Sequence, residues 1–395
     1  MQELLHALSQ ERPVGTRKNQ ELTDQIEKRL KRMGYSVSSL PFDCCTWEYG
    51  PSAICIGGQR FTVEPSPFSE PFKGTEKVCT AETLEQLEHG VCEGKILLLS
   101  GVLTETPLSP KDYPFYYPDE HRQLINLIER KKPAAIVAAT NPSELNGKTP
   151  HPLFEDGNFL IPSAVIDQQT FHQIRSLLTE KATAAELLIE SAKQPAAGRQ
   201  LIGSKKSSAS AKRIIVGAHI DTQYGTPGAL DNGMGAAVLL KTAELLAISD
   251  LTVDIVPFTS EEYYEASGEL AYLNMIDSEP ISLMINIDSP CHLGSQTAVS
   301  LYNFNEAYNQ QLNEVLPVHS MIVKGKEWYA GDHAPFLFKG VPCMAVTSSD
   351  FFEGALQYTH TPNDTMDTVD SSLILPTANF VSDYILKISE MEQSL

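Results

Sequence analysis

The sequence lacks any run of about 18 consecutive apolar residues, the length that a membrane-spanning helix requires. At its start, Met1–His6 contains no basic stretch followed by a long apolar one, so no secretory signal is expected. Basic residues are few, 30 against 50 acidic ones, which leaves a formal net charge of -20. A surface of this sign repels nucleic acid and anionic membranes. The sequence therefore predicts neither of them as a partner.

Patterned cysteines are also missing. The seven cysteines are irregularly spaced, and no Cys-x-x-Cys pair occurs. A zinc site built from thiolates is therefore not expected. Unpatterned cysteines in odd number are typical of reduced thiols in a reducing compartment, and we expect a cytoplasmic protein.

The length indicates more than one small core. A chain of 395 residues with 42% hydrophobic and 20% charged residues has ordinary globular composition. We expect two domains, or one large domain that carries an insertion. A polar, Lys- and Ser-rich segment spans 193–212, and within it Ser204–Ser210 reads as an exposed loop or linker turn.

The region before this segment alternates short apolar runs with helical patterns and predicts a small α/β unit. Strands are expected at 95–99, 134–139 and 159–166, and helices at 122–130 and 171–177. An amphipathic helix precedes the unit and ends near Gly34, where Tyr35 begins an extended segment.

The region after the polar segment has a longer alternation. Strands are expected at 214–216, 253–258, 281–287 and 341–346, and helices at 233–247, 268–275, 305–316 and 373–390. Nearly continuous apolar strands separated by helices indicate a largely parallel sheet that is buried on both faces. Ligands of such sheets bind outside the carboxyl ends of the strands.

Acidic residues and histidines gather just after these strands. His219 follows the first strand, Asp231 opens the next helix, and Asp288 follows the third strand. The full set is His219, Asp221, Asp231, Glu261, Glu262, Asp288 and His360. Taken singly, each has a structural interpretation, such as a helix cap for Asp231 or a solvated face for the two glutamates. Their convergence at one sheet edge favours a metal site.

The residue types indicate which metal would bind. Two imidazoles and several carboxylates suit zinc, with manganese or cobalt also compatible. The set exceeds what one tetrahedral zinc needs, and a two-metal site requires a carboxylate between the ions. Asp231 is the natural bridge, because it stands between the other ligand pairs in a tight Asp-Asn-Gly turn.

These motifs closely resemble the di-zinc aminopeptidases of peptidase clan MH. The resemblance covers about half of the chain, residues 213–370, and also the segment at 12–16. The matching motifs are Ala218-His-Ile-Asp221, Gly228-Ala-Leu-Asp-Asn-Gly233, Ser260-Glu-Glu262, Asn286-Ile-Asp288, Gly331-Asp-His333 with Pro335-Phe336, and His360-Thr-Pro-Asn-Asp-Thr365. The resemblance implies a three-layer α/β/α fold with a mostly parallel mixed sheet, two zinc ions per chain and a peptide substrate.

The resemblance also implies individual roles. One metal would take His219 and Asp288, and the other Glu262 and His360, with Asp231 bridging. Glu261 would be the general base that takes a proton from the attacking water. Asp221 would orient His219 from the outer shell.

Three features depart from the family or resemble it more weakly. Residues 66–190 resemble an inserted protease-associated domain, within a peptidase domain formed by 1–65 and 191–395, although a purely structural insertion is an equal alternative. Some members place a tyrosine directly before the last histidine, whereas here Thr359 stands there and Tyr358 lies one residue further back. Tyr358 is the candidate substrate-binding oxyanion donor. In the bridging segment, Met234-Gly235 replaces a frequent Ser-Gly.

Two rival functions use the same fold. Glutaminyl cyclases hold one zinc and catalyse an intramolecular acyl transfer, and some receptors of the clan have lost ligands and only bind. The full ligand set here favours two metals and hydrolysis. Aminopeptidase rather than carboxypeptidase activity rests on the resemblance alone, and a homo-oligomer is left open.

Overall fold

The computed structural model describes residues 2–111, 113, 117–141, 147–155, 157–178, 184–207, 212–263, 268–276 and 280–393. The chain divides into two compact units. Unit 1 comprises Met1–Cys44, Ala196–Glu262 and Ala266–Leu395, and unit 2 comprises Cys45–Pro195 with Tyr263–Glu265. Unit 2 thus begins at Cys45 rather than near residue 66, because the strands between these positions pair within it.

Unit 1 is built on an eight-stranded sheet of order β1-β9-β11-β10-β12-β15-β13-β14. The strands are β1 (Ser36–Tyr49), β9 (Ser191–Lys205), β10 (Arg213–His219), β11 (Val253–Phe258), β12 (Ile281–Ile287), β13 (Thr297–Tyr302), β14 (Ile322–Lys324) and β15 (Cys343–Ser348). The central strands β11, β10, β12 and β15 are mutually parallel, whereas β9 and β13 run antiparallel to their neighbours β11 and β15. The expected α/β class is confirmed, and the parallel arrangement holds for the central four strands.

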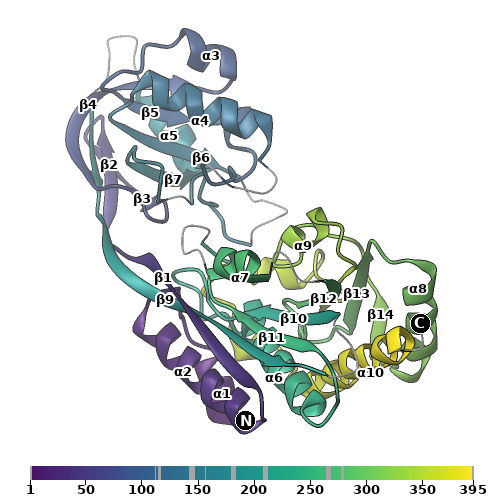
Figure 1. Ribbon diagram of the computed structural model, residues 1–395. Coiled ribbons are helices and arrows are strands. Elements are labelled where there is room, and N and C mark those ends of the chain that lie inside the picture. Colours follow the sequence, from purple (N-terminus) through teal and green to yellow (C-terminus); the bar gives the residue numbers. More distant parts are fainter. Residues whose placement is uncertain are drawn as a thin grey trace. The chain divides into compact units, whose positions relative to one another are not determined.

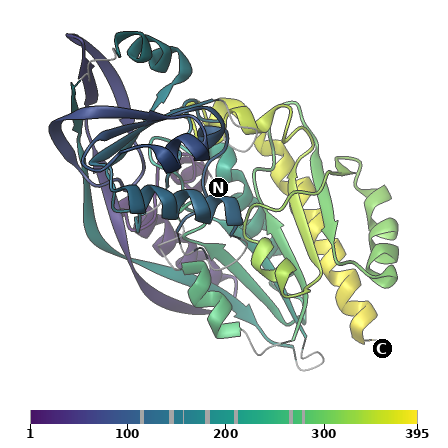
Figure 2. The ribbon, with the colours of Figure 1, turned by 90° about the horizontal axis from the view of Figure 1, so that it is seen from above.

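Helices cover both faces of this sheet (Figure 1). They are α1 (Gln2–Ala7), α2 (Arg17–Arg32), α6 (Gly235–Leu246), α7 (Gly268–Ile276), α8 (Glu306–Val315), α9 (Ala334–Phe338) and α10 (Ile374–Gln393). In Figure 2 the long yellow helix α10 runs alongside the strands of unit 1 and ends near the C-terminus. Because β10 is buried along its entire length and β11 likewise, these strands form the middle layer of the unit.

The exposed loop expected at Ser204–Ser210 starts later than predicted. Ser204 and Lys205 are the last residues of β9, a strand of 15 residues, and 206 and 207 lie in no regular element. The polar side chains have partners inside the fold: Ser204 donates a hydrogen bond to Asp254 (2.6 Å), and the Lys205 ammonium donates to the carbonyls of Ala247 and Ser249 (2.6 Å each) near the end of α6. The polar composition suggested that these side chains are exposed to solvent, because their hydrogen-bond partners lie far away in the sequence. Residues 208–211 lie outside the described residues.

Unit 2 contains a closed barrel of order β2-β3-β7-β6-β5-β4-β8. Its elements are β2 (Ser52–Ile56), β3 (Gln59–Pro65), β4 (Phe72–Ala81), α3 (Leu84–His89), β5 (Ile96–Leu99), α4 (Asp119–Lys131), β6 (Ala135–Thr140), β7 (Ser163–Asp167), α5 (Gln168–Leu177) and β8 (Ala184–Ile189). The strands expected at 95–99 and 134–139 and both expected helices are present, whereas the third strand starts only at Ser163. The resemblance to a protease-associated domain stays a prediction. Among the described residues of both units, we find no helix with the length and apolar character that crossing a bilayer requires.

Candidate metal centre

The first part of the site forms where two neighbouring parallel strands end. His219 is the last residue of β10, and Asp288 directly follows β12. The His219 imidazole is buried, and its Nε2 lies 3.5 Å from Asp288 Oδ1 and 3.0 Å from Asp231 Oδ1. Three donor side chains therefore meet at the carboxyl edge of the sheet, as the strand-end argument predicts.

A second group of donors meets on the other side of Asp231. His360 Nε2 lies 3.2 Å from Asp231 Oδ2 and 3.2 Å from Glu262 Oε2. Within each group, His219–Asp231–Asp288 and Asp231–Glu262–His360, the ligand atoms all lie within 4.8 Å of one another. Asp231 belongs to both groups, and each of its oxygens faces a different imidazole.

The loop that carries Asp231 is held from two sides. It is the segment η2 (Ala229–Met234), in which Asp231 and Asn232 have non-helical backbone angles, and it is preceded by Gly228 in the left-handed region at a φ of 66°. The Asp364 carboxylate accepts hydrogen bonds from the backbone N–H groups of Leu230 (2.6 Å) and Asp231 (3.0 Å). Asp364 stands inside a quoted motif, yet sequence reasoning assigned it no role, because the pattern does not reveal which backbone groups it reaches.

The same loop is tied to the end of β12. The Asn232 amide donates to the carbonyl of Ile287 (2.8 Å) and accepts from the backbone N–H of Ser289 (3.2 Å), so it brackets Asp288. A Cβ on Gly235 would lie 1.9 Å from the Asn232 side-chain oxygen. Glycine is therefore required there, even though the residue before it departs from the family pattern.

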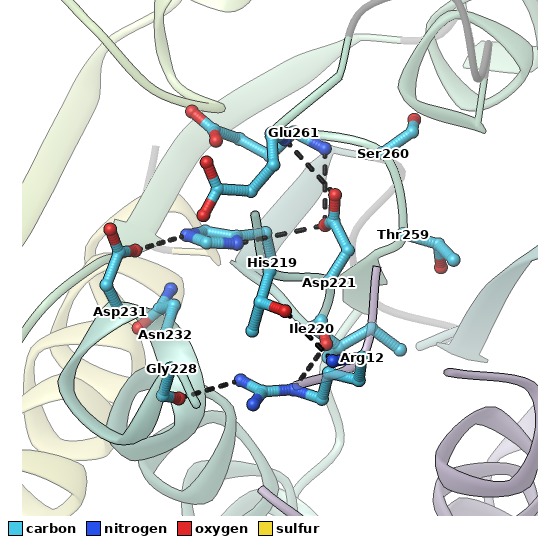
Figure 3. A network of polar contacts seen from close by, with 12 residues as sticks. Arg12, His219, Ile220, Asp221, Gly228, Asp231, Asn232, Thr259, Ser260 and Glu261 are labelled. Atoms are coloured by element: carbon cyan, nitrogen blue, oxygen red, sulfur yellow. Dashed lines mark hydrogen bonds and ion pairs between the residues drawn. The ribbon is translucent and has the colours of Figure 1, made fainter. Parts of the chain in front are cut away.

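Asp221 supports the turn that presents the two glutamates. Its carboxylate accepts hydrogen bonds from the backbone N–H groups of Glu261 (3.3 Å) and Glu262 (3.1 Å) (Figure 3). Its contact with His219 Nδ1 is 3.8 Å, longer than a hydrogen bond. The expected role of Asp221 toward His219 stays a prediction, whereas its bonds to the glutamate turn are direct. Beyond that turn, the Ser260 hydroxyl accepts from the N–H groups of Gly268 and Glu269, at the start of α7.

The electrostatics of the site follow from burial and crowded like charges. Burial raises the pKa of Glu261 well above its ordinary value, and the neighbouring carboxylates raise it further. Burial lowers the pKa of His219 and of His360, but their carboxylate contacts outweigh this and raise both pKa values well above the ordinary one. Conversely, hydrogen bonds from the two imidazoles hold the pKa of Asp231 far below its usual range despite its burial.

The donor set fits divalent metal ions. Each group offers one imidazole nitrogen and two carboxylates, which are donor types that zinc takes. Oε1 of Glu262 and Nδ1 of His360 are buried and have no hydrogen-bond partner among the described residues. Negative groups this close together require bound protons or cations to be stable in a buried site.

Two further acidic residues, Glu269 and Asp332, lie near the site. Burial raises the pKa of Glu269 to about 8 and that of Asp332 well above its ordinary value. Asp332 was quoted only as part of a motif, and nothing in the pattern marked its burial. Tyr358 precedes His360 by two residues, and its ring centroid lies 5.5 Å from that of His292. Its proposed contact with substrate stays a prediction.

The carboxyl edge of the parallel strands thus carries imidazoles and one carboxylate shared by two donor groups, as the resemblance to two-metal peptidases predicts. Residues 200–385 match Peptidase family M28, which confirms the expected family over that range. The expected class of enzyme, a metallopeptidase, is supported at the level of this family.

The chain is similar in sequence to a probable lipoprotein aminopeptidase of Mycobacterium tuberculosis, with 24% identity over 302 residues. That match covers 73% of this chain, and the chain spans 56% of the length of that relative.

Solved structures resemble the chain over nearly its full length. An aminopeptidase from Aneurinibacillus sp. strain AM-1 has a TM-score of 0.72 at 18% identity, over 97% of this chain and 92% of that one. A zinc aminopeptidase from Bacillus subtilis has a TM-score of 0.73 at 18% identity, over 98% and 94%. At this level of identity, the likeness confirms the fold.

Proposed function

We propose that this protein is an aminopeptidase that holds two zinc ions and hydrolyses the N-terminal bond of a peptide. The observation that carries the proposal is the placement of Asp231: Oδ1 is 3.0 Å from His219 Nε2, and Oδ2 is 3.2 Å from His360 Nε2. A carboxylate with its two oxygens divided between two ligand groups is what a bridged pair of metals needs. In this proposal, His219 and Asp288 hold one ion and Glu262 and His360 the other.

When bound, the ions would supply an acidified water and polarise the scissile carbonyl. Glu261 stands beside the ligand Glu262 but belongs to neither ligand group. It is therefore free to take the water's proton and pass it to the leaving amine.

The preference for a free N-terminus has two supports. Glu261, an acidic side chain outside both ligand groups, favours an α-ammonium beside the scissile bond. In addition, the solved structures of similar fold include a zinc aminopeptidase. The remaining acidic side chains of the site are compatible with the same cation.

A metal analysis combined with a substrate pair tests the proposal. Protein purified without chelator should contain about two zinc-class ions per chain, and an N-acetylated peptide should be cleaved much more slowly than its free counterpart. A reproducible value at or below one ion would refute the binuclear centre, and cyclase activity with one ion would favour the glutaminyl-cyclase alternative. Equal rates on both peptides would favour a carboxypeptidase or endopeptidase.

We also propose a cytoplasmic location. All seven cysteines are free thiols in the structure, which supports a reducing compartment. Cell fractionation would test this location by locating the protein, and thiol labelling with and without prior reduction would show whether its cysteines are reduced. Recovery in an oxidising compartment would contradict it.

A further inference from the structure

Arg12 is a fully buried cation that lies beneath the proposed metal centre without touching a ligand. Its side chain is 0% exposed, and it makes no ion pair with a described carboxylate. Burial lowers its pKa to about 10, although Asp364, Asp221 and Asp231 counteract the shift. The guanidinium therefore carries its charge at neutral pH. Burying a charge costs free energy of desolvation, which must be offset by the hydrogen bonds that the group makes.

Its guanidinium donates to the carbonyl of Gln10 in its own segment (3.0 Å) and to backbone carbonyls of two distant segments. Nε donates to Ile220 O (2.7 Å), Nη1 to Pro227 O (3.0 Å) and Nη2 to Gly228 O (3.0 Å). Ile220 directly follows His219, and Gly228 directly precedes the turn that carries Asp231. One planar, rigid group thus spans the backbone on both sides of the contact between the His219 imidazole and the Asp231 carboxylate (Figure 3).

The segment around Arg12 is itself anchored to the loop between these two carbonyls. The Arg12 backbone N–H donates to the Thr222 hydroxyl (2.9 Å), and the Glu11 carboxylate accepts from the Gly225 N–H (3.1 Å). A Cβ on Gly233 would lie 2.2 Å from the carbonyl oxygen of Leu8. The N-terminal segment therefore lies directly against the bridging turn while contributing none of the proposed ligands.

We propose that Arg12 is a positioning residue for the metal centre: by joining Ile220 to Gly228 it sets the placement of Asp231 relative to His219, and so the affinity and geometry of metal binding. The proposal rests on the proposed function, because it presumes that these residues bind metal. The residue acts only through the backbone of the ligand-bearing segments.

Lysine cannot replace this group. An ammonium keeps the charge but concentrates its donors at one point, so it cannot reach both Ile220 O and Gly228 O. The Arg12→Lys variant therefore separates geometry from charge. Arg213→Lys is the matched control, since Arg213 is also buried, lies at the opposite end of β10 and pairs with Asp254.

The experiment titrates the chelated full-length proteins with zinc by calorimetry and with cobalt by visible absorption, alongside thermal melting. Wild-type binding of two ions establishes the metal centre itself, and its absence would refute the proposed function and this inference together. Arg12→Lys should bind about 10–100-fold more weakly, as outer-shell substitutions do, with an altered cobalt spectrum. Arg213→Lys should melt at a lower temperature but keep the wild-type affinity and spectrum.

Two results would overturn the inference while the metal centre stands: Arg12→Lys with wild-type affinity and spectrum, or an equal loss of affinity in both variants. If Arg12→Lys fails to fold, Thr222→Val takes its place. That change keeps the methyl group near Gly228 and removes only the acceptor of the Arg12 N–H. A smaller weakening in the same direction supports the inference, and unchanged affinity refutes it.

Discussion

The adjacent glutamates provide the sharpest prediction, because the structure gives them different surroundings. Glu262 Oε2 lies 3.2 Å from His360 Nε2 within a ligand group, whereas Glu261 belongs to neither group. Glu261→Gln leaves all the proposed ligands in place but cannot accept the water's proton. General-base catalysis contributes about 10²–10⁴-fold, so kcat should fall by about that factor, which corresponds to about 3–5 kcal/mol in the barrier. Both metals should stay bound.

Glu262→Gln should behave in the opposite way. It replaces a charged ligand by a neutral amide, so the affinity of one metal site should fall, and excess zinc should partly restore the activity. The assay measures kcat, KM and metal content for both variants on a peptide with a free N-terminus. Glu306→Gln on the exposed start of α8 is the control and should match wild type.

Two results would contradict these roles of Glu261 and Glu262. If Glu261→Gln loses metal and Glu262→Gln keeps it, the two roles are exchanged. If both variants keep their metal and most of their rate, neither residue belongs to the site, and the proposed metal centre is refuted.

Two further predictions concern stability and the second unit. In the metal-free protein, burial raises the pKa of Asp221 to about 6, of Asp364 to about 7 and of Glu269 to about 8. The stability that these carboxyls contribute is fully present below about pH 4, where they are protonated in both the folded and the unfolded state, and it is lost as the pH rises through their folded pKa values. The melting temperature should therefore fall between about pH 5 and about pH 8. A rising melting temperature over that range would contradict it. Replacing residues 45–195 by a short linker should leave both metals bound, since all the proposed ligands lie in unit 1. If unit 2 shapes substrate preference, the dependence of KM on peptide length should change. Loss of metal from a folded deletion variant would show that unit 2 has another role.

Local patterns in the sequence predicted the core of the fold. The apolar runs of β10, β11, β12 and β15 mark strands buried on both faces, and such runs can be recognised without knowing any partner. The outer strand β1 was expected as an extended segment from Tyr35, whereas β9 was not recognised because no local pattern marks it. The end of β9 is polar, and its side chains Ser204 and Lys205 find their hydrogen-bond partners, Asp254 and the end of α6, only in the folded chain.

The site divides in the same way. The order and types of the ligands were readable in the sequence, because parallel strands present their carboxyl ends at one edge. That edge places His219 and Asp288 together before any side-chain geometry is known.

Only the tertiary structure decided how those ligands are held. It gave Asp231 one oxygen for each imidazole, and it brought Asp364 to the backbone of the bridging turn from 133 residues away. It likewise placed Arg12 against Ile220 across 208 residues. Side chains that bind backbone carbonyls and amides leave no motif, because any residue supplies those groups, and only the folded chain selects which of them meet.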